Sequence, residues 1–180
     1  MVKYFTADWH LNERRIGEHN LYFRPFKTVE EQNRIIINNV NDVVQPDDEL
    51  YVVGDAVVDN EGVALLERIN CKNRILIVGN HDEKRLDLLQ KHFKEIHESL
   101  DVRIGNVACH LNHYPLNHVS DRFNIVGHIH GLWKVKPNMV NVGVDAWHFR
   151  PVSEAEILFV YDGIKNHYDG HVFVHCQKEA

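Results

Sequence analysis

Short apolar runs that alternate with segments of helical period dominate the first half of the sequence. The apolar runs have the length of strands buried in a sheet and lie at 2–7, 50–54 and 74–78. The segments that follow them repeat their apolar residues with the helical period and lie at 28–44, 61–69 and 83–93. Because strands that alternate with helices form parallel sheets covered by those helices, this order predicts an α/β fold.

The pattern changes after residue 95. Strand-like segments follow at 97–104 and 107–111, joined by the hairpin pair Gly105-Asn106, and at 123–127 and 139–144. These strands predict a second sheet that is antiparallel or mixed. We therefore expect an α/β fold in the form of a four-layer α/β/β/α sandwich, with two packed mixed sheets flanked by helices, in a single domain of residues 1–180.

Two capping boxes mark helix starts. Thr28 precedes Glu31 by three residues before the first helix, and Ser153 stands in the same relation to Glu156 before a helix near the end of the chain. We expect an edge strand after that helix, at 171–176.

Charge and cysteine content exclude several classes of protein. The net charge of −6 argues against binding extended nucleic acid through a broad basic surface. No apolar run approaches the roughly 20 residues needed to cross a bilayer, so we expect no membrane partner. Three widely separated cysteines argue against a disulfide framework, and the first residues lack the pattern of a signal peptide. We therefore expect a cytoplasmic protein. The sequence predicts no oligomeric state.

Histidine is unusually frequent, with 14 spread along the chain, and several stand where a predicted strand ends. The carboxyl ends of strands in an open α/β sheet are the usual place for a site. Five strand ends carry carboxylate, amide or imidazole groups, which are Asp8 with His10, Asp55, Asn80 with His81 and Asp82, His113, and His128 with His130.

These groups suit two adjacent divalent cations. Imidazole and carboxylate together favour first-row transition metals over Ca²⁺ and Mg²⁺. In an extended segment, Asp8 and His10 would point to the same side and grip one ion. Asp55 follows a glycine and is the candidate bridge between two ions about 3.5–4 Å apart. A single D-x-H or H-x-H motif arises roughly once by chance at this composition, so neither motif alone indicates a metal site. What indicates the site is that all five motifs occur, each at the end of a predicted strand.

The five motifs, in this order, resemble the calcineurin-like metallophosphoesterases, whose pattern is D-x-H, GD, GNH[DE], a lone His and GHxH. The resemblance spans about three quarters of the chain. Three further segments resemble the small bacterial and phage members of the family, namely Arg24-Pro25-Phe26, His113-Tyr114-Pro115-Leu116 and Asn141-Val142-Gly143-Val144-Asp145-Ala146-Trp147.

The resemblance implies a role for each motif residue. Asp8, His10 and His130 would hold one ion, and Asn80, His113 and His128 a second. Asp55 would bridge both, and a hydroxide between the ions would attack phosphorus in line. His81 would protonate the leaving oxygen or stabilise the phosphoryl charge, with Asp82 orienting it. We expect Mn²⁺ first, with Fe, Zn and Ni left open, and His110 is an alternative to His113.

The resemblance also narrows the substrate. The GD motif continues as Ala56-Val57-Val58-Asp59 without the arginine of the protein phosphatases, which argues against that activity. We expect hydrolysis of phosphodiester or phosphomonoester bonds in a small substrate, which includes nucleotides. The alternatives are a nuclease for short or single-stranded nucleic acid and a non-catalytic, metal-bound binding module. Arg24 is the residue we expect to bind the substrate phosphate, and Trp9, Trp133 and Tyr114 either stack on a base or pack.

Overall fold

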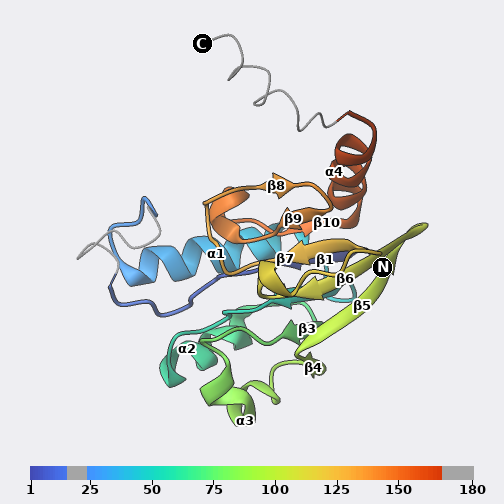
Figure 1. Cartoon of the computed structure of the whole chain (residues 1–180). Helices are drawn as coiled ribbons and strands as arrows, with labels where there is room; N and C mark the ends of the chain where they lie inside the picture. The colour runs from blue at the N-terminus through green and yellow to red at the C-terminus, as the bar shows by residue number, and fades with distance from the viewer. Residues whose placement is uncertain (16–23, 168–180) are drawn as a thin grey trace, which may run out of the picture.

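The computed structural model describes residues 1–15 and 24–167, and two five-stranded sheets form its centre (Figure 1). The first sheet has the order β10-β1-β2-β3-β4. Its strands are parallel except β10, which pairs antiparallel with β1. The bounds are β1 Lys3–Thr6, β2 Glu49–Val53, β3 Asn73–Ile77, β4 Glu95–His97 and β10 Val152–Ser153.

The second sheet has the order β5-β6-β7-β9-β8. Its three central strands are parallel, and an antiparallel strand closes each edge. The bounds are β5 Ser99–Ile104, β6 Val107–Asn112, β7 Phe123–Val126, β8 Val135–Lys136 and β9 Met139–Asn141.

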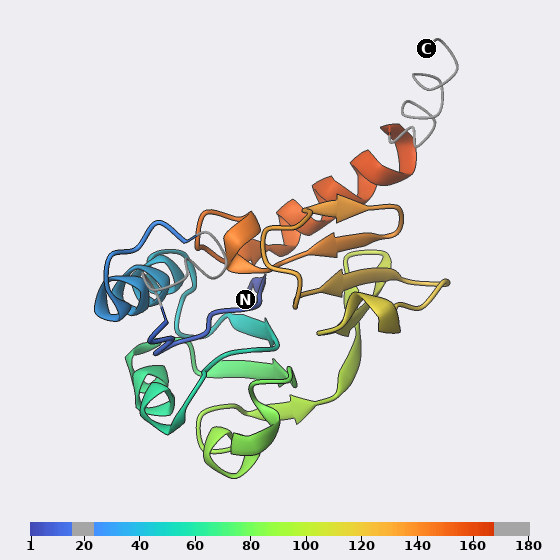
Figure 2. The same ribbon diagram turned by 60° about the vertical axis from the view of Figure 1, so that its left-hand side comes forward.

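Helices α1, α2 and α3 lie together on one face of the first sheet (Figure 2). Ile36 and Val40 of α1 are buried in one cluster with Leu50 and Val52 of β2. The helical elements are α1 Val29–Val43, α2 Asn60–Leu65, α3 Leu86–Leu89 and α4 Glu154–His167, with 3₁₀ turns η2 Leu66–Arg68, η3 Glu83–Arg85, η4 Pro115–Asn117 and η5 Val144–Ala146.

The opposite face of the first sheet packs against the second sheet. Side chains alternate along each strand, so Val53 and Ile77 meet Leu111 and Ile125 in a second buried cluster, which Ile157 of α4 joins. The predicted α/β fold, with two packed mixed sheets flanked by helices, is confirmed.

The structure differs from the sequence-based expectation in several elements, among them the strand expected at 139–144, which ends at Asn141 and is followed by η5. The strand expected at 97–104 is two strands, because the chain leaves the first sheet after β4 and enters the second at β5. The helix expected at 83–93 is only η3 followed by α3, because Lys94 already donates to the carbonyl of Arg74 beside β3 (2.8 Å). Strand β8 has two residues, too few for a periodic signal. The expected strand at 171–176 lies outside the described residues.

Both capping boxes are present, but they differ in detail. Ser153 and Glu156 bond reciprocally, with Glu156 N donating to Ser153 Oγ (3.3 Å) and Ser153 N donating to Glu156 Oε2 (2.9 Å). Thr28 caps α1 by accepting from Glu31 N (3.1 Å), while the Glu31 carboxylate accepts from the backbone of Lys27, one residue earlier (2.8 Å).

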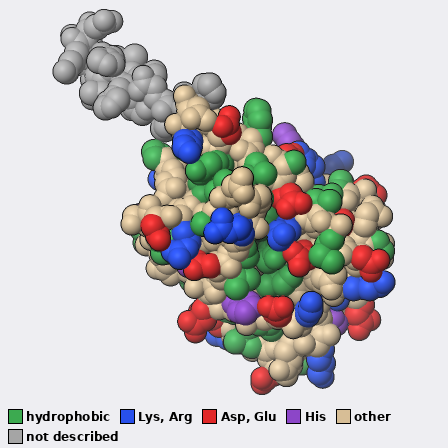
Figure 3. Space-filling view, turned by 90° about the vertical axis from the view of Figure 1, so that its right-hand side faces the viewer, with side chains coloured by type: hydrophobic (Ala, Val, Ile, Leu, Met, Phe, Trp, Pro, Cys, Tyr) green, Lys and Arg blue, Asp and Glu red, His purple; other side chains and the backbone are tan. Residues whose placement is uncertain are grey.

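Charged side chains of both signs are mixed on the face seen in Figure 3, around a patch of hydrophobic side chains. The described part of the chain contains no helix with the length and apolar character that a bilayer crossing requires.

Candidate metal centre

The predicted site residues follow strands of both sheets. Strands β1, β2 and β3 of the first sheet and β6 and β7 of the second each lead into one of the polar motifs. Pairing between the first two strands continues past their ends, because Asp8 N donates to the carbonyl of Gly54 and His10 N to the carbonyl of Asp55 (3.0 Å each). Backbone hydrogen bonds therefore hold the first two motifs side by side.

Five of the predicted ligands have left-handed backbone conformations. Their φ angles lie between 47° and 73°, at Asp8, His10, Asp55, His128 and His130. Such conformations cost about 1–3 kcal/mol each and cluster at functional sites. The expectation that Asp8 and His10 lie on an extended segment was wrong. The two side chains converge through a tightly turned loop instead.

The side chains of Arg24 and Gln32 hold the loop that carries Asp8 and His10 by hydrogen bonds to its carbonyl groups. The Arg24 guanidinium donates to the carbonyls of Asp8 and Trp9, and the Gln32 amide donates to the carbonyl of His10 (3.1 Å). Arg24 is buried, with 1% of its side chain exposed, and forms a bidentate pair with Asp145 (2.7 and 2.9 Å). Its position does not support the expectation that Arg24 binds the substrate phosphate, because its guanidinium bonds to the protein beneath the site.

Three groups of side chains could each hold a cation, because their donor atoms lie within 4.8 Å of one another. His10 belongs to the first and second groups and Asp55 to the second and third, so the groups form one continuous cluster. The groups are Asp8 with His10 and His130, His10 with Asp55 and His81, and Asp55 with His113 and His128.

Asp55 lies at the centre of this cluster. Its Oδ2 atom is 3.5 Å from His10 Nε2 and 3.4 Å from His113 Nε2, and its Oδ1 atom accepts from His81 N (2.9 Å). One carboxylate oxygen thus faces an imidazole on each side. This is the position that a bridging ligand requires.

His113 presents one nitrogen to the site. Its Nδ1 atom lies 2.8 Å from the carbonyl of Val53, which can only accept a hydrogen bond. Its Nε2 atom is buried, faces Asp55 Oδ2 at 3.4 Å and forms no hydrogen bond of good geometry with any of the described residues. A ring nitrogen oriented in this way by a backbone carbonyl is a typical metal ligand. The donor set and this buried nitrogen fit a first-row divalent cation.

Burial and neighbouring charges shift the pKa values of several residues in the cluster. Burial raises the pKa of Asp8 to about 6. Burial acts in the same direction on Asp55, but the imidazoles of His113 and His10 outweigh it and lower the pKa of Asp55. Burial disfavours the charged form of His113, yet the carboxylates of Asp55 and Asp8 raise its pKa to about 9. A positive charge among these carboxylates is therefore favourable, whether a proton or a metal ion supplies it.

Asp145 is a functional candidate that we did not predict as a site residue. Its carboxylate lies 2.9 Å from Nδ1 of His130 and also binds Arg24. A carboxylate behind a ligating histidine fixes the ring and raises its basicity. Asp145 lies in the segment from Asn141 to Trp147, and the resemblance of that segment to small family members is the sequence signal that could have identified it.

The remaining motif residues lie in the loop after β3. Asn80 is exposed, and His81 is half-buried with its ring 4.7 Å from that of His10. Asp82 does not bond to the His81 ring in the structure. Its carboxylate accepts from the backbone N–H groups of Asp55, Ala56 and Gly79 (2.8–3.0 Å). Asp82 therefore fixes the loop that carries the central carboxylate, rather than orienting His81.

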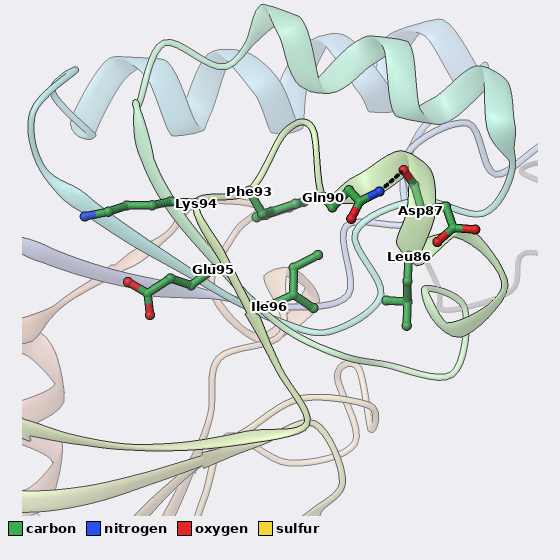
Figure 4. Close-up of a pocket in the computed structure, with 7 residues that line it drawn as sticks. All are labelled: Leu86, Asp87, Gln90, Phe93, Lys94, Glu95 and Ile96. Atoms are coloured by element: carbon green, nitrogen blue, oxygen red, sulfur yellow. Dashed lines mark hydrogen bonds between the residues drawn. The ribbon is translucent and has the colours of Figure 1, made fainter.

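Other candidates lie away from the cluster. His110 pairs with Asp101 (2.7 Å) and belongs to none of the three groups, which favours His113 over it. Trp9 is fully buried in the core and cannot stack on a substrate. A separate hollow on α3 and β4, where Gln90 donates to the carbonyl of Asp87, contains no residue of the cluster (Figure 4).

Comparisons with known proteins found a sequence relative and solved structures that are similar to this chain. No family model matches the sequence. An uncharacterized protein of Methanocaldococcus jannaschii is 28% identical over 162 residues, which are 83% of this chain and 85% of the relative. A crystal structure of a protein of unknown function from Aquifex aeolicus has a TM-score of 0.71 and 25% identity, over 88% of this chain and 98% of the other.

A solved structure of Yfce, a phosphoesterase from E. coli, has a TM-score of 0.52 and 15% identity, over 79% of this chain and 78% of the other. This likeness concerns the fold. It confirms the predicted fold class, a sandwich of the metallophosphoesterase type.

Proposed function

We propose that this protein is a metal-dependent phosphoesterase that hydrolyses an ester bond in a small phosphate-containing substrate. The single observation that carries the proposal is the position of Asp55, whose Oδ2 atom lies within 3.5 Å of an imidazole nitrogen on either side. One carboxylate between two sets of N and O donors is the arrangement that holds a pair of cations for phosphate ester hydrolysis. The fold shared with a phosphoesterase supports it.

The proposed ligands divide between two positions. Asp8, His10 and His130 would hold one divalent ion, and Asn80, His113 and His128 the other, with Asp55 common to both. Bound there, two such ions supply a nucleophile at neutral pH and withdraw charge from the phosphoryl oxygens. We propose Mn²⁺ as the first ion to test, with Fe, Zn and Ni as alternatives.

His81 is the proposed general acid. Hydrolysis forms a bond from phosphorus to the oxygen of water and breaks the bond to the leaving oxygen, which must gain a proton. The His81 ring stands at the edge of the cluster against His10 and is half-buried, so it can reach both a bound ester and solvent. A positioned acid of this kind contributes about 10²–10⁴-fold to the rate.

The test measures metal content and turnover in parallel. Protein stripped with a chelator and reloaded with Mn²⁺ is assayed with bis-p-nitrophenyl phosphate and with p-nitrophenyl phosphate. We expect turnover only after reloading. His81→Ala should retain bound metal and lower kcat, with the greater loss on esters whose leaving alcohol is less acidic than p-nitrophenol, whereas Asp55→Asn should lose both metal and activity.

His110→Ala is the matched control, because this histidine pairs with Asp101 outside the cluster. It should retain both metal and activity. Two bound ions without turnover of either ester would count against the enzymatic proposal and favour a metal-bound binding module. Loss of metal in His81→Ala would show that His81 is a ligand instead of the acid.

A further inference from the structure

An apolar hollow of about 390 Å³ opens beside the candidate metal centre. Its volume is within the range of sites that bind small molecules. It lies next to the loops that carry His113 and His128 and is separate from the hollow on α3 and β4. Most of its lining is apolar or aromatic, from Tyr114, Pro115, Leu116, Ile129, Trp133 and Met139.

The hollow is continuous with the metal centre through two side chains. His128 belongs both to its lining and to the donor group around Asp55. The Tyr114 ring also lines it, and the ring centroid lies 5.0 Å from that of His113 and 5.0 Å from that of His128. A phosphoryl group held at the centre therefore lies next to the mouth of this hollow.

Two polar side chains of the lining contact other groups of the protein. The Lys136 ammonium stacks over the Trp133 ring, 4.9 Å from its centroid. The His118 ring lies with Nδ1 3.0 Å from the carbonyl of Pro115. Leu116, whose side chain is 93% exposed, stands at the rim. Planar aromatic groups suit such a lining, because they stack on Tyr and Trp rings without requiring hydrogen bonds.

The proposed acid contacts a ring that does not line the hollow. The His81 ring contacts His10, whereas the rings of His113 and Tyr114 surround His128. The leaving oxygen must lie near His81. The ester group that stays on phosphorus is therefore the group directed toward the hollow.

We propose that this hollow binds the retained ester group of the substrate and that this group carries a planar aromatic ring. The preferred substrates are then phosphodiesters, since a phosphomonoester has no retained ester group. Aryl groups and nucleosides share the required chemistry. The inference rests on the proposed function, because it assumes that the phosphoryl group binds at the metal centre.

Three diesters with the same leaving group test it, namely methyl, phenyl and thymidine 5′ p-nitrophenyl phosphate. Each kcat/KM of the Mn²⁺-loaded protein is divided by the rate constant of the same ester with hydroxide. We expect phenyl, thymidine or both to exceed methyl by at least about tenfold, the discrimination that an apolar pocket achieves. Preference for one aromatic ester over the other identifies the source of the ring.

Variants assign the preference to the hollow. Trp133→Ala should abolish it, and Leu116→Glu should reduce it without threatening the fold, since that side chain is 93% exposed. Leu132→Ala is the matched control, because Leu132 is 79% exposed beside Trp133 and does not line the hollow. Equal corrected values for the three esters, or a preference that survives both lining variants, would overturn the proposal.

A separate measurement distinguishes failure of the inference from failure of the proposed function. If no diester is hydrolysed, the enzymatic proposal fails, and binding is then compared by NMR titration of the Mn²⁺-free protein with thymidine 5′-monophosphate and inorganic phosphate. At least about tenfold tighter binding of the nucleotide, lost in Trp133→Ala, supports the hollow as an aromatic site. Equal binding of the two probes refutes it.

Discussion

The buried pair between Arg24 and Asp145 makes a quantitative prediction about stability. Only 1% of the Arg24 side chain and 5% of the Asp145 side chain are exposed, and the two groups share two hydrogen bonds. Asp145→Asn keeps the shape but leaves the guanidinium charge buried without its counter-charge. Removing one member of such a pair costs about 3–5 kcal/mol. For a chain of this size, that lowers Tm by about 6–20 °C.

A double-mutant cycle measures the interaction itself. Urea unfolding of the wild type, Arg24→Met, Asp145→Asn and the double variant is followed in the presence of a chelator, so that metal binding does not contribute. We expect the double variant to be more stable than the sum of the single effects by about 2 kcal/mol or more. Single costs that add to within about 0.5 kcal/mol would refute the reasoning.

The same pair should also affect metal binding. The Asp145 carboxylate orients the His130 ring, because its Oδ2 atom lies 2.9 Å from Nδ1 of His130. The loss of such a partner typically weakens metal affinity about 10- to 100-fold. Isothermal titration of Asp145→Asn with Mn²⁺, at a temperature where the variant is folded, measures this effect separately from stability. Unchanged affinity would show that the carboxylate serves only Arg24.

Three further predictions concern two residues of α4 and the glycine that precedes Asp55. The hydrogen bond from Arg150 lowers the pKa of Glu156 from 4.5 to about 2, so the contribution of Glu156 to folding stability is complete above pH 4.5 and is lost as the pH falls toward 2. Glu156→Gln should therefore lower the free energy of unfolding by about 1 kcal/mol at pH 6 and by progressively less toward pH 3, as measured by urea unfolding. A cost that does not change with pH would contradict this reasoning. Gly163→Ala should stabilise the protein by about 0.5–1 kcal/mol in a thermal melt, because a Cβ there meets nothing within 4 Å. Gly54→Ala should destabilise it and weaken Mn²⁺ binding, because φ is +88° and the new Cβ would lie 2.1 Å from His113 Nδ1; a stable, metal-binding variant would disprove the steric argument.

The sequence predicted the layers and the position of the site well, because both depend on local signals. Buried strands appear in the sequence as short apolar runs, and a polar residue that directly follows such a run therefore lies at the end of a strand. Asp8, Asp55 and His113 are far apart in the chain, yet the pattern alone brings them to one edge of the fold. The same reasoning anticipated the central position of Asp55 from the glycine that precedes it.

The sequence did not predict the contacts that orient these groups. The pair between Arg24 and Asp145 joins residues 121 positions apart, and periodicity carries no information about such a partner. The left-handed backbone of Asp8 and His10 occurs where hydrogen bonds from Arg24 and Gln32 hold their carbonyl groups, and these partners lie too far along the chain for a local pattern to indicate them. Asp82 has the residue type expected beside a catalytic histidine, but its carboxylate bonds to backbone N–H groups instead.

The division of the donor groups between the two sheets links metal binding to the folding of the whole chain. Both carboxylate oxygens of Asp8, after β1, accept from the backbone N–H of His128, after β7, across 120 positions (3.0 Å each). Each of the two proposed ion positions takes ligands from both halves of the sequence, so an ion bound at either position would cross-link the two sheets. Its binding energy is available only once the sheets have docked, and at 100 times its Kd it would add about 2.7 kcal/mol to global stability. Metal binding would thus be coupled to the docking of the two sheets.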